Sequence, residues 1–218
     1  MRQRRTSFSS RRTLCALALL SLTAACGESG GGRAQLIADS TLLAELTQRL
    51  AADQAARERL TSLMRSGQAP DSATIHGMMT VDSANTRWLR ESVAKDGFPT
   101  KARIGEEGMK AVFLLVQHAD HDTAFQAWVL PHLEKAYAAG DVRGQDVALL
   151  TDRLATARGL PQEYGSQADI ENGRVILKPI RDSANVDARR AKMGLPSMKE
   201  YLRVLDSVYV GVPAPKGK

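Results

Sequence analysis

The sequence has little of what most readily identifies a function. It contains two cysteines, aromatic residues make up 5% of it, and no Walker-type phosphate loop is present. Its longest apolar run spans residues 14–25, whereas a transmembrane helix needs about 20 residues. The scarcity of cysteine excludes a disulfide-rich scaffold, and the missing loop excludes the commonest nucleotide-binding motif. We expect no cofactor.

The N-terminus has the parts of a bacterial export signal. Residues 1–12 carry five arginines and no acid, and the apolar run follows. The run ends Leu22-Thr23-Ala24-Ala25-Cys26, which resembles a lipobox with Thr23 at a position that is usually Leu. We therefore predict a signal peptide over residues 1–25, acylation of Cys26 and a Gly/Ser-rich flexible tether over residues 26–34. A plain cleaved signal or an uncleaved anchor is the alternative, and export through the Sec or Tat route stays open.

Export changes how the charge is interpreted. Removal of residues 1–25 takes away five of the 30 basic residues and none of the 24 acidic ones, which leaves 25 against 24. A nucleic-acid partner, which would need a basic surface, therefore loses its support from composition. The prediction is an extracytoplasmic protein whose partner is a membrane, through the lipid. Gly27 lacks the aspartate that retains some lipoproteins at the inner membrane, which favours the outer membrane in a cell with two.

Apolar spacing predicts a mainly α protein, a helical bundle with one small β-hairpin in the C-terminal third. The domain is expected over residues 35–209, followed by a disordered tail over residues 210–218. Residues 66–80 are interpreted as a break between the first two helices. Helices are expected over residues 40–65, 82–95, 106–119, 122–140, 143–157, 186–193 and 198–209, and a hairpin over residues 167–178 that turns at Asn172-Gly173.

Two charged residues interrupt the apolar seam of the first helix. Asp53 and Arg57 occupy positions that the spacing of Leu46, Leu50 and Leu60 would give to apolar side chains. Four residues apart, they lie on one helical face and can form an ion pair. Such a pair part-way to the surface is one interpretation; the other is that one of them faces a polar cavity, where a buried charge needs a partner.

A group of titratable residues follows the most apolar helix. His118 and Asp120 are candidates for general acid–base catalysis, because partial burial moves a histidine pKa into a useful range. A histidine that is simply hydrogen-bonded in the core is the alternative. His118, His121 and Asp122 have the spacing of metal ligands, but we predict no metal because the helix should break at Asp120 and no second ligand pair completes four.

A second polar group contains Tyr164 and Gln167, with Gln162 and Ser166 beside them. Neutral amides and a phenol suit hydrogen bonding to an uncharged polar ligand. They suit equally well a loop that must satisfy its own backbone groups. If a site exists, we expect these side chains to line one cleft: His118, Asp120, Gln117, Asp53, Arg57, Tyr164 and Gln167.

These motifs, in this order, resemble a family of bacterial proteins whose function is unknown. The similarity covers about residues 42–206, and Ser166 stands where the family more often has threonine. His121 stands where the family often has an apolar residue, which argues against a required ligand there. The motifs are DQ-x-x-R (53–57), G-x-P (97–99), LLVQHAD (114–120), FQ (125–126), DR (152–153), Q-x-YGSQ (162–167), PI-x-D (179–182) and NVDARR (185–190).

The sequence thus supports two functional hypotheses. The first is a membrane-anchored module that binds a polar small molecule or an envelope protein. The alternative is a hydrolase-type enzyme that uses His118 and Asp120 as acid and base. The enzyme requires His118 to lie within hydrogen-bond reach of an acid and to be open to a pocket. The binding module requires a cleft reached by Tyr164 and Gln167.

Overall fold

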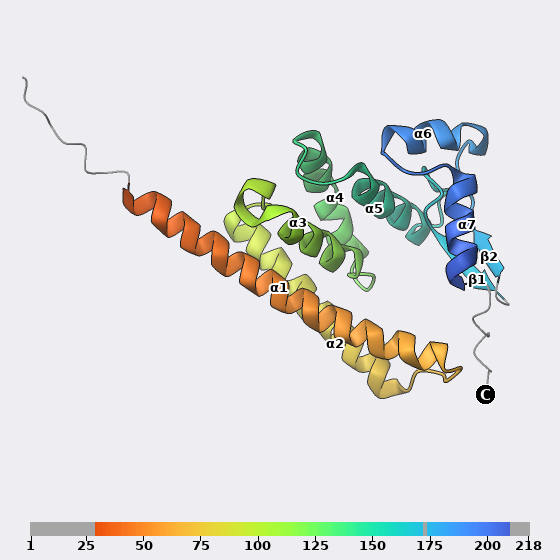
Figure 1. Ribbon diagram of the computed structural model, residues 1–218, viewed down its shortest axis with the longest axis horizontal. Helices are drawn as coiled ribbons and strands as arrows, with labels where there is room; N and C mark the ends of the chain where they lie inside the picture. Colours follow the sequence, from red (N-terminus) through yellow and green to blue (C-terminus); the bar gives the residue numbers. More distant parts are fainter. Residues whose placement is uncertain (1–28, 172–173, 210–218) are drawn as a thin grey trace, which may run out of the picture.

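The computed structural model describes residues 29–171 and 174–209, and these form a helical bundle with one antiparallel hairpin (Figure 1). The mainly α fold and the position of the hairpin are as predicted. The signal peptide, Cys26, the Asn172-Gly173 turn and the tail over residues 210–218 lie outside the described residues. Among the described helices, none combines the length and the apolar character that crossing a bilayer requires.

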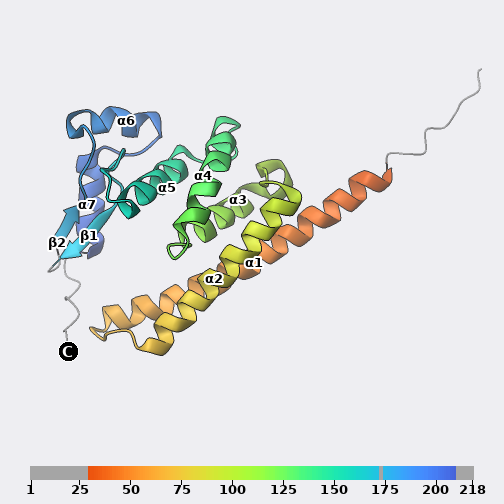
Figure 2. The ribbon, with the colours of Figure 1, turned by 180° about the vertical axis from the view of Figure 1, so that it is seen from behind.

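Two long helices run antiparallel along one side of the molecule. Helix α1 spans Ser29–Arg65 and helix α2 spans Ser72–Asp96, and both views show them side by side (Figures 1 and 2). Helix α1 begins inside the segment 26–34 that was predicted to be a flexible tether. The boundary differs because the helix extends N-terminally over glycines that propensity alone would exclude from it.

Helix α2 starts ten residues earlier than the sequence indicated, so the predicted break over residues 66–80 was wrong beyond residue 71. The Asp71 side chain caps the helix by accepting a hydrogen bond of 2.7 Å from the Thr74 amide. Thr74 is buried, while Ile75 and Met79 are exposed. The first turns of α2 therefore lack the apolar periodicity by which a helix is recognised.

The core is built on helix α3, which spans Lys101–Gln117. Its backbone is interrupted at Gly105, where φ is 70° and ψ is −178°, so the continuous helix begins at Glu106 as expected. Val112 and Val116 are completely buried, and Phe125 of helix α4 (Thr123–Ala138) packs in the same cluster. Most residues of α3 from Gly108 onward are buried, in agreement with its apolar sequence. Because α1 and α2 both pack on α3, the polar seam of α1 meets the end of α3.

A side-chain cap marks the start of the helix that follows α3. Asp122 accepts a hydrogen bond from the Phe125 amide at 2.8 Å and so begins α4. Helix α5 spans Gly144–Ala157 and packs against α4. Because α3 ends at Gln117 and α4 starts at Thr123, helical spacing does not relate His118 to His121 or Asp122.

The C-terminal part surrounds the hairpin. Strand β1 (Ala168–Glu171) pairs with β2 (Arg174–Leu177) so that Ala168 lies opposite Leu177. A short 3-10 turn (Ser183–Asn185), α6 (Val186–Lys192) and α7 (Met198–Tyr209) follow, and α7 packs on β2. A capping box precedes α7, because Glu200 accepts hydrogen bonds from the Ser197 amide and hydroxyl.

Candidate functional site

The charged residues in the seam of α1 belong to a buried network that joins three helices. His118, the residue after α3, places Nδ1 2.9 Å from Asp53 Oδ1, and Asp53 is only 1% exposed. Arg57 Nε lies 2.8 Å from the same ring nitrogen, and Arg57 Nη2 donates to Asp82 Oδ1 of α2 at 2.9 Å. We call Asp53, Arg57, Asp82 and His118 the charged network.

The Nδ1 atom of His118 contacts both a hydrogen-bond acceptor, Asp53, and a hydrogen-bond donor, Arg57. If His118 Nδ1 carries a proton it donates to Asp53; if it does not, it accepts from Arg57 Nε. In the first arrangement, Arg57 Nε still lies 3.4 Å from Asp53 Oδ1, and the Gln54 side-chain amide donates to Asp53 Oδ2 at 2.8 Å. The buried carboxylate is thus partnered in either case, as a buried charge requires.

Asp82 is the second buried carboxylate of the charged network, with 10% of its side chain exposed. Burial raises the pKa of its carboxyl above the ordinary value, and the neighbouring Arg57 guanidinium opposes this shift. Arg57 is the more open member, with 22% of its side chain exposed, and His118 has 17%. The network therefore reaches the surface through Arg57 and His118, while the two carboxylates lie inside.

Asp120 does not belong to this network. It is 63% exposed and forms an ion pair with Arg153 of α5, whose Nη1 lies 2.6 Å from Asp120 Oδ1. The Gln126 side chain donates to the backbone carbonyls of Val116 and Gln117, which closes the end of α3. The structure therefore pairs His118 with Asp53 instead of Asp120, because the chain turns away from the helix axis after His118.

Tyr164 and Gln167 belong to a different hydrogen-bond network, which holds a loop. The completely buried Asp152 accepts backbone N–H groups from Glu163, Tyr164 and Ser166 at 2.8–3.0 Å. Gln162, also completely buried, accepts from the Gln167 amide through Oε1 and donates to the Gln167 carbonyl through Nε2. The polar group around Tyr164 is thus used mainly to satisfy backbone groups, the second of the two interpretations of it.

The environment of Tyr164 is partly apolar and partly anionic. Burial raises the pKa of its phenol, and the nearby carboxylate of Glu163 adds to the shift. Its backbone carbonyl accepts from Arg190 Nη1 at 2.7 Å, and Arg190 is itself 1% exposed. Neither Tyr164 nor Gln167 contacts the charged network among the hydrogen bonds and ion pairs of the described residues. The candidate residues therefore do not line one cleft: Asp53, Arg57 and His118 share the charged network, Asp120 pairs with Arg153, and Tyr164 and Gln167 belong to the loop. Gln117 contributes its backbone carbonyl to the contact with Gln126.

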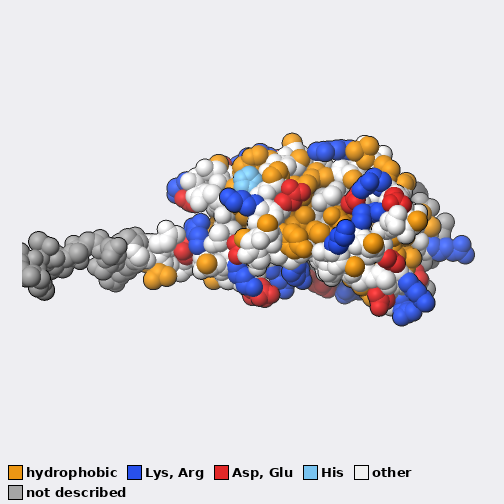
Figure 3. Space-filling view, turned by 90° about the horizontal axis from the view of Figure 1, so that it is seen from above, with side chains coloured by type: hydrophobic (Ala, Val, Ile, Leu, Met, Phe, Trp, Pro, Cys, Tyr) orange, Lys and Arg blue, Asp and Glu red, His pale blue; other side chains and the backbone are white. Residues whose placement is uncertain are grey.

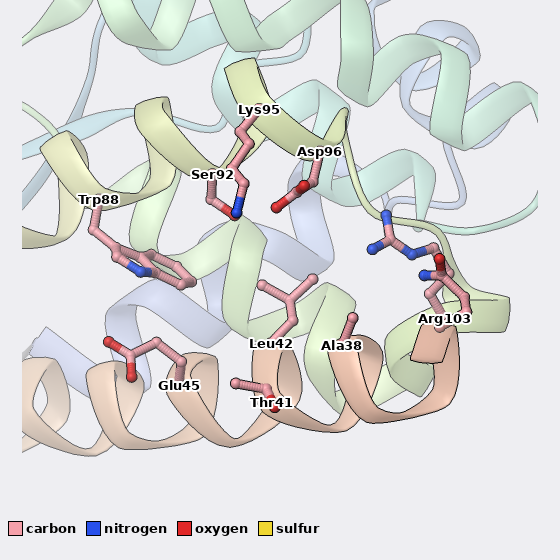
Figure 4. A pocket seen from close by; sticks show the side chains of 10 residues that line it. Ala38, Thr41, Leu42, Glu45, Trp88, Ser92, Lys95, Asp96 and Arg103 are labelled. Carbon is pink, nitrogen blue, oxygen red and sulfur yellow. The ribbon is translucent and has the colours of Figure 1, made fainter. Parts of the chain in front are cut away.

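A cavity lies elsewhere, between α1, α2 and the first turn of α3 (Figure 4). It has a volume of about 750 Å³, and we call it the α1/α2 cleft. Figure 4 shows Trp88, Ser92 and Lys95 projecting from α2 toward α1. The residues that line the cleft are Gln35, Ala38, Thr41, Leu42, Glu45, Trp88, Ser92, Lys95, Asp96 and Arg103.

Contacts within the protein fix one end and one wall of the cleft. At the end, Arg103 Nε and the Gln35 amide both donate to Asp39 Oδ1 at 2.8 Å. Along the wall, the guanidinium of Arg49 lies 4.4 Å from the centre of the Trp88 ring and pairs with Glu45 at 2.6 Å. Such cation–π stacking holds the indole in one orientation.

The sequence did not indicate this cleft. The lining positions recur along α1 and α2 at ordinary helical spacing, so no sequence pattern marks them. The sequence signal is limited to Ser92, Lys95 and Asp96, and polar residues near a helix end are also typical of an exposed helix end. Among the described residues, no group of three His, Cys, Asp or Glu side chains is placed to hold a metal ion.

Comparison with known proteins gives one match. A family model described as a family of unknown function (DUF6624) matches residues 40–212. No curated protein and no solved structure matches the chain.

Proposed function

The chain belongs to this family of unknown function, and from its own geometry we propose that it is a lipid-anchored extracytoplasmic module that binds a small polar ligand in the α1/α2 cleft. The observation that carries the proposal is the cleft itself. Its volume of about 750 Å³ falls within the range of small-molecule sites, which is roughly 300–1,000 Å³.

The lining of the cleft favours a ligand with both a polar and an apolar part. Lys95 and Asp96 bring opposite charges to the rim from adjacent positions at the end of α2, and Ser92 adds a hydroxyl. Trp88 and Leu42 offer apolar surface on the opposing walls. Because acids and bases balance, the cleft suits an uncharged or zwitterionic molecule better than an anion or a cation.

The N-terminal sequence supports the lipid anchor. A basic segment, a short apolar run and small residues precede Cys26, and the first described helix begins three residues later at Ser29. Acylation would make Cys26 the first residue of the mature chain and hold the body outside the cytoplasm. The cleft lies along the half of α1 that is closer to Cys26, since its α1 residues fall between Gln35 and Glu45.

Ligand binding in the α1/α2 cleft is tested with a variant whose larger side chain fills the cleft. The full-length protein is processed in a bacterial host, extracted in detergent and examined by native mass spectrometry and thermal shift against free amino acids, short peptides and neutral sugars. We expect Ala38→Trp to abolish binding, because Ala38 lines the cleft. Ala44→Trp, on the same helix and also exposed, lies outside the cleft and should bind normally.

Equal binding by the two variants would contradict the cleft as the site. The absence of any bound mass from the native protein, together with no thermal shift across the panel, would contradict the binding function itself. Fatty-acyl mass on the N-terminal peptide tests the anchor separately, and a peptide that begins at Met1 or carries no acyl chains would overturn it.

A hydrolytic role for His118 is the second candidate, and the contact of 2.9 Å with Asp53 favours it. A carboxylate on Nδ1 orients the ring and leaves Nε2 to accept a proton. Asp53, and not Asp120, would then be the positioning residue. Hydrolysis of a panel of nitrophenyl esters by the native protein, lost in His118→Asn, would support this role; a native protein as inactive as the variant would exclude it for these substrates.

A further inference from the structure

The first turns of α1 expose two large apolar side chains beside the predicted anchor. Leu36 is 72% exposed and Ile37 is 58% exposed, and residues 35–38 are all exposed before the buried Asp39. In Figures 1 and 2 this end of α1 projects past α2 and α3. Figure 3 shows hydrophobic side chains on the narrow end of the molecule, next to the grey trace.

Leu36 continues the seam by which α1 packs on the core. Leu43 and Leu46 lie seven and ten positions further along, on the same helical face, and both belong to the core or pack against it. At Leu36, α1 extends beyond α2 and α3, which cover this face of the helix further along. The helix thus presents to the outside the face that would normally be buried.

The length of chain before the helix limits what can cover this face. Residues 26–28 span at most about 10 Å if extended, and the seven helical steps from Ser29 to Leu36 add about 10 Å. An acylated Cys26 would therefore lie within roughly 20 Å of Leu36. A membrane that holds the acyl chains is within reach of both apolar side chains.

A lipid surface fits this face better than a second copy of the chain does. Each of the two side chains offers apolar surface on the order of 100 Å², whereas a stable protein interface buries about 800 Å² on each partner. A surface to which the chain is already tethered needs far less contact area, because tethering raises the effective concentration. Residues 27–38 contain one acid and one base, so charge attraction to lipid headgroups contributes little.

We propose that Leu36 and Ile37 lie in the lipid–water interface, so that the N-terminal turns of α1 form a second membrane contact beside the acyl chains. This proposal rests on the lipid attachment at Cys26 in the proposed function. The contact fixes which end of the helical pair faces the bilayer, and it places the Asp39–Arg103 end of the α1/α2 cleft next to the headgroups.

The test places one environment-sensitive fluorophore on the helix. The sequence has two cysteines; processing removes Cys15 and acylation blocks Cys26, so Leu36→Cys carries the only free thiol of the acylated chain. The full chain, labelled with a nitrobenzoxadiazole group, is reconstituted into vesicles of phosphatidylethanolamine and phosphatidylglycerol. We expect blue-shifted emission that spin-labelled lipids quench. Ala44→Cys, exposed on the same helix two turns further on, should show neither effect.

Each outcome separates the two proposals. Equal emission and quenching at positions 36 and 44, in a chain whose N-terminal peptide carries acyl mass, overturns the interfacial contact and leaves the anchor standing. A chain without acyl mass, in which Cys26 also takes the label, overturns the anchor. A quenching signal that disappears in 1 M salt would assign the contact to charge instead of Leu36 and Ile37, and would also overturn the proposal.

Discussion

His118 Nδ1 lies 2.9 Å from Asp53 Oδ1, so the residue that follows α3 contacts a nearly fully buried carboxylate from the middle of α1. This contact joins residues 65 positions apart. Arg57 adds α2 to the same network through Asp82. The three helices that carry the α1/α2 cleft are therefore tied together at a point away from it.

Removal of the Asp53 carboxylate should be strongly destabilising. In Asp53→Ala, the buried ends of Arg57 and His118 lose a partner, and breaking a buried pair from one side costs about 3–5 kcal/mol. The free energy of unfolding from urea titration measures this. Glu58→Ala removes an exposed ion pair with Arg65 on the same helix and should cost about 1 kcal/mol or less; equal losses would contradict the network as a stabilising element.

Asp152 should be required for the loop that contains Tyr164. Its carboxylate accepts three backbone N–H groups, and Asp152→Asn replaces one acceptor oxygen with a donor. An unsatisfied buried amide costs about 1–3 kcal/mol. We expect lower stability and faster proteolysis between residues 158 and 167. Asp169→Asn, at an exposed ion pair with Lys178, is the matched control and should leave both unchanged.

The capping carboxylate of α4, Asp122, should make the free energy of unfolding depend on pH. The Phe125 amide, and next the Arg90 guanidinium, lower the pKa of Asp122 below its ordinary 3.8. A depressed pKa contributes stability that is present above 3.8 and disappears as the pH falls through the folded-state pKa.

We therefore expect Asp122→Ala to cost about 1 kcal/mol at neutral pH and progressively less in acid. Asp122→Asn keeps an acceptor for the Phe125 amide but lacks the charge. Its loss of stability at neutral pH should therefore be smaller than that of Asp122→Ala, and it should also decrease in acid. A cost that stays constant from neutral pH to below 3.8 would show that the charge is irrelevant. Chemical denaturation across this pH range measures all three proteins.

Two helical glycines should respond in opposite ways to replacement by alanine. A Cβ at Gly144 would lie 2.6 Å from the Met193 backbone oxygen, so Gly144→Ala must separate α5 from the end of α6 and should be destabilising. A Cβ at Gly77 of α2 meets nothing within 4 Å, and Gly77→Ala should stabilise by about 0.5–1 kcal/mol. Melting temperatures of the two variants give the comparison directly.

The sequence predicted those elements whose apolar positions face the core. Residues 106–119 were identified because Val112 and Val116 lie in a run that is buried on nearly every side. The first ten residues of α2 were missed because Thr74 is buried there while Ile75 and Met79 are exposed, which inverts the usual pattern. The start of α1 was missed because it contains three consecutive glycines, at positions 30–32, which have low helix propensity.

The candidate site could be predicted only in part. Asp53 and Arg57 were recognised as polar residues on an apolar face, and they do meet His118. Sequence alone could not select Asp53 over Asp120 as the partner of His118, because the two lie 65 and two positions away and only tertiary packing decides. The same holds for Asp152, whose three amide partners come from a loop that follows its own helix.

Gly105 adopts a backbone conformation, φ 70° and ψ −178°, that residues with a side chain almost never occupy. The preceding turn carries Arg103, whose link to Asp39 closes one end of the α1/α2 cleft. The angle between that turn and the rest of α3 is thus set by a single pair of dihedrals. An alanine at this position would touch nothing within 4 Å, but it would strain this backbone and so disturb both Arg103 and the neighbouring Ile104, which is buried in the core.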